Sequence, residues 1–183
     1  MSIEVEVKLK IEDKEQVKEK LMQLGFSEGE LVAETDVYYT AAHHDFAGLD
    51  EALRIRNIEN QRTKESTSVI TYKGAKMDNK SMTRKELETE VGDAVVCREI
   101  LENVGFCPVP PVEKRRQYLQ KENVTACVDE VKNLGDYLEL EIIVDMEEEK
   151  EAAFEKLKNV LELLGYSMED TTRTSYLSML MKK

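Results

Sequence analysis

Within the first ten residues, MSIEVEVKLK, aliphatic and charged side chains alternate strictly from Ile3 onward. Successive side chains of a β-strand point to opposite faces, so this alternation predicts a strand with one aliphatic and one charged face. The charged face carries Glu4, Glu6, Lys8 and Lys10. It needs water, a partner or a polar cavity, because unpaired buried charges are costly. An exposed edge strand protected by its charges would give the same pattern, so the remaining strands decide between these alternatives.

The same alternation returns in most of the later segments that we expect to be strands. They lie at 36–39, 53–58, 68–73, 84–91, 112–119, 124–131 and 137–144. The short polar turns between the last three are typical of an antiparallel meander. The charged positions on these strands are Arg54, Arg56, Lys73, Arg84, Glu86, Glu88, Lys114, Arg116, Asp129, Glu139 and Glu141.

Three amphipathic helices are predicted, and each ends at a glycine followed by an aromatic residue. They begin near Asp13, Asp93 and Glu147 and end before Gly25, Gly105 and Gly165. The first two copies of this ending are about 80 residues apart, which suggests a duplicated unit. We therefore expect a single domain over 1–183 made of two similar halves, roughly 1–91 and 92–183. The segment 174–181 is expected to be a short strand or a final helical turn.

A closed sheet explains both the charged face and the helices. If the aliphatic face points outward under the three helices, the charged face lines the interior, and closure also removes the sheet edges. Cross-strand salt bridges that serve only stability are the alternative. Exposed ion pairs contribute only about 0–1 kcal/mol each, so stability alone is a poor reason for so many charges. A site for phosphate and metal is the better explanation.

Composition limits the partners and the compartment. The formal net charge of −12 argues against a general nucleic-acid or anionic-membrane binder, and an anionic substrate would need a local cationic site. The three cysteines have no CxxC spacing and predict reduced thiols in a cytoplasmic protein. No apolar run approaches the roughly 18 residues of a spanning helix. The adjacent His43 and His44 are interpreted as solvated loop residues rather than metal ligands.

A family resemblance follows from the motifs. EVEVK at residues 4–8 resembles the ExExK signature of the CYTH superfamily, the triphosphate tunnel metalloenzymes. The other segments follow in the family's order over nearly the whole chain: DVYY from 36, LRIR from 53, TYKG from 71, TRKELE from 83, KRRQY from 114, VDEVKNLGDYLELE from 128 and TSYLSML from 174. The match is closest to the class IV adenylyl cyclase branch. Met179 departs from that pattern, since an acidic residue is frequent at its position.

The resemblance implies an α+β fold: a closed antiparallel eight-stranded β-barrel, the triphosphate tunnel, with amphipathic helices outside. It also implies Mg²⁺ or Mn²⁺ and a triphosphate substrate. The implied metal ligands are Glu4, Glu6, Asp129, Glu139 and Glu141. The implied phosphate-binding residues are Lys8, Arg54, Arg56, Lys73, Arg84, Lys114 and Arg116. The implied catalytic residues are Glu6, Lys8, Asp129 and Glu139. A homodimer is also expected by resemblance.

Three functions remain open at the level of the sequence. In an adenylyl cyclase-like enzyme the ribose 3′-hydroxyl of ATP attacks the α-phosphate and pyrophosphate leaves. In a triphosphatase, acting on thiamine triphosphate or inorganic tripolyphosphate, water is the nucleophile and the same side chains serve. The third is a non-catalytic sensor or binder of polyphosphate or nucleotide. The general base is not obvious from the residues, because no histidine or cysteine lies among the predicted tunnel positions.

Overall fold

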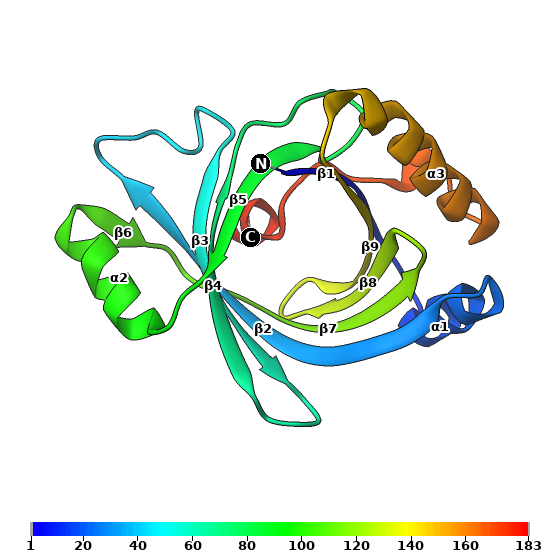
Figure 1. Ribbon diagram of the computed structural model, residues 1–183, viewed down its shortest axis with the longest axis horizontal. Coiled ribbons are helices and arrows are strands. Elements are labelled where there is room, and N and C mark those ends of the chain that lie inside the picture. The colour runs from blue at the N-terminus through cyan, green and yellow to red at the C-terminus, as the bar shows by residue number, and fades with distance from the viewer. Residues whose placement is uncertain (1, 183) are drawn as a thin grey trace.

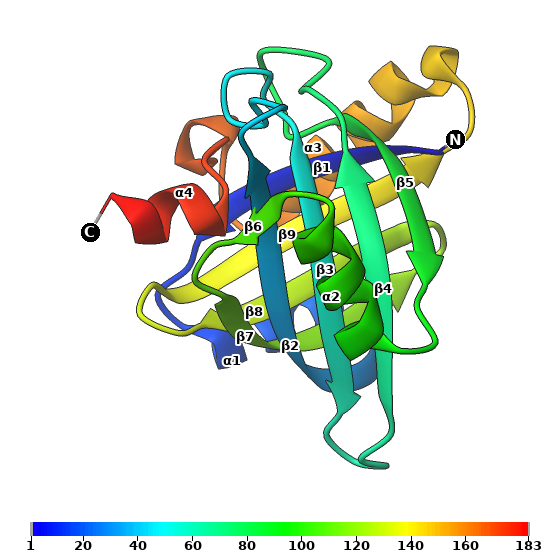
Figure 2. The same ribbon diagram turned by 90° about the vertical axis from the view of Figure 1, so that its left-hand side faces the viewer.

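The computed structural model describes residues 2–182 and is built around one antiparallel sheet that closes on itself. The strands are β1 (Ser2–Lys10), β2 (Ser27–Ala41), β3 (Ala52–Asn60), β4 (Ser66–Lys73), β5 (Arg84–Glu90), β6 (Phe106–Pro108), β7 (Val112–Lys121), β8 (Val124–Val131) and β9 (Gly135–Val144). The order is β3-β4-β5-β1-β9-β8-β7-β2, and β2 pairs with β3 to close an eight-stranded barrel (Figures 1 and 2). The short β6 pairs with the end of β2. The predicted eight-stranded barrel is confirmed.

The register places charged residues of neighbouring strands side by side. Glu6 of β1 lies opposite Glu141 of β9, and Lys8 lies opposite Glu139. On its other edge β1 pairs with β5 over its first residues only. Beyond that point the loop 74–83 and the C-terminal segment complete the edge, because the amide of Met82 donates to the carbonyl of Glu6 and the amide of Thr172 donates to that of Lys8. Both segments are thereby brought to the barrel opening.

The helices are α1 (Lys14–Gln23), α2 (Ala94–Asn103), α3 (Lys150–Leu163) and α4 (Tyr176–Met181), with short 3₁₀ turns at Glu147–Glu149 and Met168–Asp170. The side chain of Asp13 accepts from the amide of Gln16 and caps α1. The glycines that follow the first three helices have φ values of +91°, +97° and +91°, which glycine adopts without steric cost. The predicted helix ends are confirmed.

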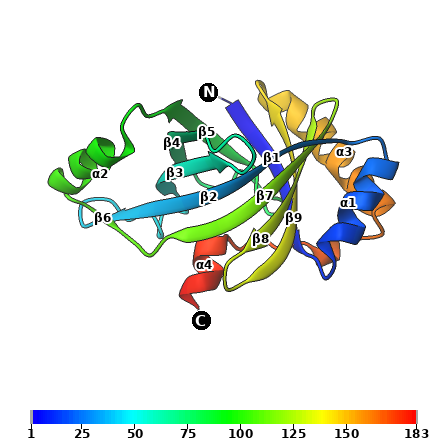
Figure 3. The same ribbon diagram turned by 90° about the horizontal axis from the view of Figure 1, so that it is seen from below.

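The hydrophobic core lies outside the barrel, between its wall and the helices. The aliphatic faces of β1, β8 and β9 pack against α1 and α3, with Leu21, Leu157 and Leu161 completely buried. Helix α2 covers β2 and β3 on the opposite side (Figures 1 and 3). Because the outer wall supplies the core, the barrel interior is left to charged side chains, as the alternation predicted.

Three elements differ from the sequence prediction, and one of them, the short strand β6, was not predicted. Strand β2 begins at Ser27, not at 36, because it is long enough to pair with both β7 and β3. Its first half was missed because the exposed Glu28 and Glu30 flank a glycine, and a register shift interrupts the alternation there. The segment 174–181, left open above, forms helix α4 with Ser175 as its N-cap. The similarity of the two halves of the chain stays a prediction.

No helix among residues 2–182 has both the length and the apolar character needed to cross a bilayer.

Candidate active site

A cavity of about 520 Å³ opens at the end of the barrel where the loops 42–51 and 74–83 and helix α4 lie. Side chains of β1, β2, β3, β4, β5, β7 and β9 line it, and α4 adds Tyr176 and Leu177. Figure 1 shows α4 at the opening of the barrel when the molecule is viewed along its interior. The cavity therefore gathers residues from nearly every strand of the closed sheet.

One wall of the cavity, formed by β2, β3 and β7, is basic. We call Arg54, Arg56 and Lys114 the basic wall. The guanidinium of Arg56 donates to both carboxylate oxygens of Asp36 over 2.6 and 2.8 Å. The ammonium of Lys114 lies 2.7 Å from Oε2 of Glu34. These residues alternate along their strands, so the pleat aims all of them inward.

The opposite wall, formed by β1 and β9, is acidic. We call Glu4, Glu6, Glu139 and Glu141 the acidic wall. The ammonium of Lys8 is 3.1 Å from Oε1 of Glu139 and 3.4 Å from Oε1 of Glu6. Arg116 reaches across from β7 and pairs with Glu139. The acidic wall is thus interleaved with two of the predicted phosphate-binding cations.

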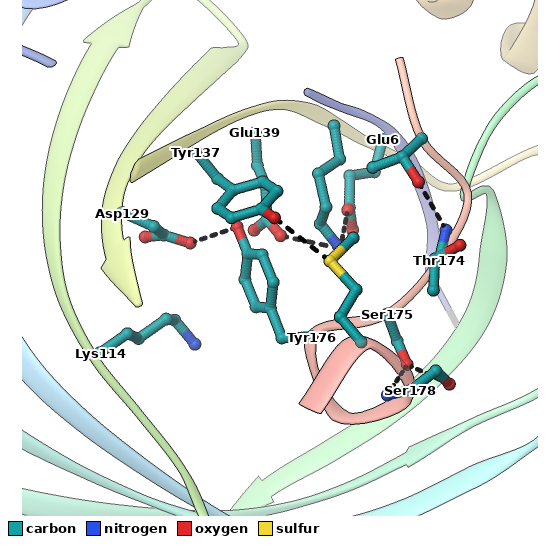
Figure 4. Close-up of polar contacts among 12 residues, drawn as sticks. Glu6, Lys114, Asp129, Tyr137, Glu139, Thr174, Ser175, Tyr176 and Ser178 are labelled. Atoms are coloured by element: carbon teal, nitrogen blue, oxygen red, sulfur yellow. Dashed lines mark hydrogen bonds and ion pairs between the residues drawn. The ribbon is translucent and has the colours of Figure 1, made fainter. Parts of the chain in front are cut away.

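Asp129 lies behind this wall and does not line the cavity. Both of its oxygens accept hydrogen bonds from the guanidinium of Arg116, each over 2.6 Å. The hydroxyl of Tyr176 donates to Oδ2 over 3.0 Å. Figure 4 shows the Tyr176 ring entering the barrel from α4 toward Asp129, and the ring lies 4.4 Å from the ammonium of Lys8. Helix α4 therefore seals Asp129 from the cavity and places an aromatic face against Lys8.

Two further cations lie at the β4–β5 side of the cavity. Lys73 is 3.0 Å from Oε2 of Glu4 and also pairs with Glu86. Arg84 donates to the backbone carbonyls of Asp50 and Gly74, and its second nitrogen is 3.2 Å from Oδ1 of Asp50. Arg84 therefore ties together the two loops at the opening, 42–51 and 74–83, as well as lining the cavity.

The pKa values separate the carboxylates into two groups. Burial raises the pKa of Glu141 to about 8, and the nearby charge of Glu4 adds to this shift. Burial also raises the pKa of Glu6, and the charge of Glu139 acts in the same direction. For Asp36 burial works against ionisation, but the charges of Arg56 and Lys114 outweigh it and hold the pKa well below the ordinary value. Glu6 and Glu141 of the acidic wall thus favour a proton or a cation. Burial opposes the ionisation of Glu4 and Glu139 too, but the neighbouring cations outweigh it and lower their pKa values, so these two are ionised like Asp36.

The acidic wall has the donor chemistry that Mg²⁺ or Mn²⁺ requires. Both ions prefer carboxylate oxygens, and the pKa values of Glu6 and Glu141 are raised by burial and by neighbouring carboxylates, so a bound cation would favour their ionised forms. Oε1 of Glu6 is buried and accepts no hydrogen bond from the described residues. Among residues 2–182, no three acidic, histidine or cysteine side chains are already gathered as a metal site. Lys8 and Arg116 lie between these carboxylates and pair with them. The carboxylates therefore have the donor atoms that the ion prefers, but metal binding requires Lys8 and Arg116 to turn toward another anion.

The structure brings together eleven of the twelve predicted site residues. Of the twelve, Asp129 does not line the cavity. The eleven that line it are Glu4, Glu6, Lys8, Arg54, Arg56, Lys73, Arg84, Lys114, Arg116, Glu139 and Glu141. Their roles stay predictions. Sequence reasoning missed Glu34 and Asp36 as charged interior residues, although their two-residue spacing was a usable signal. It also missed Lys76, Arg173 and Tyr176, which come from loops and α4 and carry no periodic signal.

Fold and site together define a charged tunnel protein: a closed barrel whose interior holds opposed basic and acidic walls. The model of the CYTH domain family matches residues 2–176. The chain is 38% identical over 177 residues to a Methanocaldococcus jannaschii protein named "Putative adenylate cyclase MJ0240", covering 97% of this chain and 98% of that protein. The chain belongs to the CYTH family, as its motifs predicted.

Solved structures show the same architecture. The PH1819 protein from Pyrococcus horikoshii superposes with a TM-score of 0.89 at 36% identity, over 98% of both chains. The HpAC1 protein from Hippeastrum, described as a "putative adenylyl cyclase" that reveals a dominant triphosphatase activity, shares the fold at a TM-score of 0.66 and 16% identity, over 100% of this chain and 96% of that one.

Proposed function

We propose that this protein is a metal-dependent enzyme that converts ATP to cyclic AMP and pyrophosphate. The observation that carries the proposal is a cavity in which a basic wall faces an acidic one. A triphosphate is a polyanion whose oxygens suit arginine and lysine donors, and its metal-bound form needs carboxylates on the other side. The named relative from Methanocaldococcus jannaschii supports the same assignment.

A second observation favours a nucleotide over inorganic tripolyphosphate. Apolar side chains from the loop 42–51, β3 and α4 also line the cavity, among them Phe46, Leu53 and Leu177. An aromatic ring gains about 25 cal/mol for each Å² of apolar surface that it buries. An inorganic polyphosphate has no group to place there. We therefore assign this apolar part of the cavity to the base of a nucleotide.

The reaction forms a bond between the ribose 3′-oxygen and the α-phosphorus, and it breaks the bond from that phosphorus to the oxygen bridging to the β-phosphate. Pyrophosphate leaves with the electron pair of the broken bond. The side chains of the basic wall, with Lys8, Lys73 and Arg116, would hold its charge. Mg²⁺ or Mn²⁺, held by the acidic wall, would supply charge neutralisation and a lower pKa for the attacking hydroxyl. The 3′-proton would pass to a carboxylate of the acidic wall or to solvent.

A triphosphatase is the second candidate. The cations and carboxylates of the cavity address only the phosphate chain, so they would serve equally when water attacks a terminal phosphorus. The shared fold of HpAC1 supports this alternative, because the description of that protein names a dominant triphosphatase activity. Thiamine triphosphate would also place an aromatic ring in the apolar part of the cavity.

The test is a turnover panel with Mg²⁺ and then Mn²⁺, at neutral and alkaline pH. ATP, thiamine triphosphate and inorganic tripolyphosphate are offered, and cyclic AMP and pyrophosphate are resolved from orthophosphate. Cyclic AMP with an equal amount of pyrophosphate supports the cyclase. Orthophosphate without cyclic AMP identifies a triphosphatase. Binding without turnover of any of the three would leave a polyphosphate or nucleotide sensor as the function.

A cytoplasmic location and a homodimer remain part of the proposal. All three cysteines lie in the described part of the chain and are free, which agrees with a reducing compartment.

A further inference from the structure

Two buried carboxylates lie within the basic wall, and the proposed reaction assigns no role to them. Glu34 and Asp36 are each 1% exposed and project from β2 into the barrel. Asp36 borders the cavity, while Glu34 lies behind it, where the hydroxyl of Tyr118 donates to Oε1 over 3.0 Å. A binding wall for phosphate would be more attractive to a polyanion without them.

These two carboxylates occupy the donors that a phosphate would use. Asp36 accepts two parallel hydrogen bonds from Arg56, the same geometry in which arginine binds a phosphate group. Asp36 also lies 3.3 Å from the ammonium of Lys114 and 3.5 Å from Arg54. Glu34 lies 3.0 Å from the second terminal nitrogen of Arg56. All three cations of the basic wall are therefore neutralised by the protein's own oxygens.

The carboxylates remain charged under working conditions. Burial opposes the ionisation of Glu34, but the charges of Arg56 and Lys114 outweigh it and keep its pKa well below the ordinary value. Asp36 behaves in the same way. Glu6 and Glu141 of the acidic wall differ, since burial raises their pKa values. A divalent cation would relieve the acidic wall, whereas Glu34 and Asp36 already have their counter-charges.

We propose that Glu34 and Asp36 are built-in counter-ions, positioning residues that fix Arg56 and Lys114 and weaken the hold of the basic wall on polyphosphate. The inference rests on the proposed function of the cavity. The arrangement keeps the cations in place without substrate, and it lowers the affinity for a polyphosphate product that must leave. A purely structural ion pair would have the opposite consequence for binding, because its loss would disorder the cations and weaken their grip.

The experiment measures binding of inorganic tripolyphosphate by calorimetry with EDTA present. Tripolyphosphate has no nucleobase and EDTA removes divalent metal, so neither contributes to the measured affinity. Glu34→Gln keeps the size of the side chain and removes its charge. We expect it to bind tripolyphosphate about tenfold more tightly than the wild type, a difference of about 1.4 kcal/mol. Glu113→Gln is the matched control, since Glu113 lies next to Lys114 on β7 but pairs with the exposed Lys132 on the outer surface. We expect its affinity to equal that of the wild type.

Thermal unfolding gives an independent reading. Without ligand, Glu34→Gln should unfold at a lower temperature than the wild type, because it leaves buried cations unpaired. Saturating tripolyphosphate should raise its unfolding temperature more than that of the wild type, since phosphate replaces the missing charge. If Glu34→Gln does not fold alone, tripolyphosphate should restore its folded circular dichroism spectrum.

The outcomes separate the two proposals. Equal or weaker tripolyphosphate binding by Glu34→Gln, beside a wild type that binds, would overturn the counter-ion role and leave the proposed function standing. The same holds if tripolyphosphate fails to restore an unfolded Glu34→Gln. A wild type that binds neither tripolyphosphate nor ATP, with Mg²⁺ present as well as in EDTA, would overturn the proposed function and this inference with it.

Discussion

Tyr176 of α4 donates a hydrogen bond to Asp129 of β8 over 3.0 Å, although the two residues are 47 positions apart in the chain. The contact fastens the C-terminal helix at the barrel opening, and it closes off the oxygen of Asp129 that Arg116 shares. Figure 4 shows the Tyr176 ring among Lys114, Asp129 and Glu139. One hydroxyl thus links the last helix to the ion pairs of the site.

Replacing Tyr176 by phenylalanine should destabilise the protein. Tyr176→Phe removes a hydrogen bond to a buried carboxylate, and the expected loss in the free energy of unfolding is about 1–3 kcal/mol. Urea unfolding followed by circular dichroism measures it. Tyr137→Phe is the control, because the Tyr137 hydroxyl donates to the weak acceptor sulfur of Met179 at 3.4 Å. Equal stability of Tyr176→Phe and the wild type would contradict this account of the contact.

Removing Glu139 should abolish metal-dependent turnover. Its carboxylate pairs with both Lys8 and Arg116, so Glu139→Ala deprives the acidic wall of a ligand and two cations of their partner. We expect a fall in kcat/KM of at least about 100-fold on the substrate that the panel identifies, the scale of losing one charged group from a site. Circular dichroism checks the fold, and Glu130→Gln, on the outer face of β8 beside Lys14, serves as the control. Full activity in a folded Glu139→Ala protein would remove Glu139 from the site.

The stability of the metal-free protein should fall as the pH rises from about 5 to about 8. Burial raises the pKa of Glu141 from 4.5 to about 8 and that of Glu86 to about 7. The folded state therefore holds protons that the unfolded state has released, and this contribution is lost as the pH passes the folded pKa. Groups with lowered pKa values, such as Glu34, change the stability only below about pH 4.5, so they do not affect the slope between about pH 5 and about pH 8.

Unfolding temperatures in EDTA between pH 5.5 and 8.5 measure this slope, and Glu141→Gln should flatten it. A stability that rises over this range in the wild type would show that the carboxylates of the acidic wall are not crowded in the way the structure places them.

Magnesium should stabilise the protein more at pH 8 than at pH 6. The acidic wall must lose its protons before its oxygens bind an ion, so metal binding and proton release are coupled. The measurement is the rise in unfolding temperature on adding Mg²⁺ at each pH. Glu6→Gln should reduce the rise, whereas Glu113→Gln should keep it. A rise that is the same at both pH values would argue against metal binding at these carboxylates.

The outer core should tolerate little truncation. Leu157 of α3 is completely buried against the barrel wall, so Leu157→Ala should cost about 2–5 kcal/mol of the free energy of unfolding. Leu163 of the same helix is 68% exposed, and Leu163→Ala should change stability by less than about 0.5 kcal/mol. Urea unfolding compares the two. A small loss in Leu157→Ala would mean that α3 is loosely attached to the barrel.

The sequence by itself determined which face of each strand is charged and where the first three helices end. A period of two assigns every side chain of a strand to one face, and a glycine with positive φ ends a helix by local sterics. Eleven of the twelve predicted site residues follow from that alternation, since inward-pointing positions share one lumen once the sheet closes. The start of β2 could not be predicted, because a register shift there interrupts the two-residue alternation.

Only the tertiary structure decided which charges meet. Alternation does not say which strands are neighbours, so it could not show that Glu6 faces Glu141 across β1 and β9. Nor could it show that Asp36 binds Arg56, or that α4 sends Tyr176 to Asp129. These contacts depend on the order of strands around the barrel and on where the last helix docks. Both are set by closure of the sheet and by packing between residues far apart in the chain.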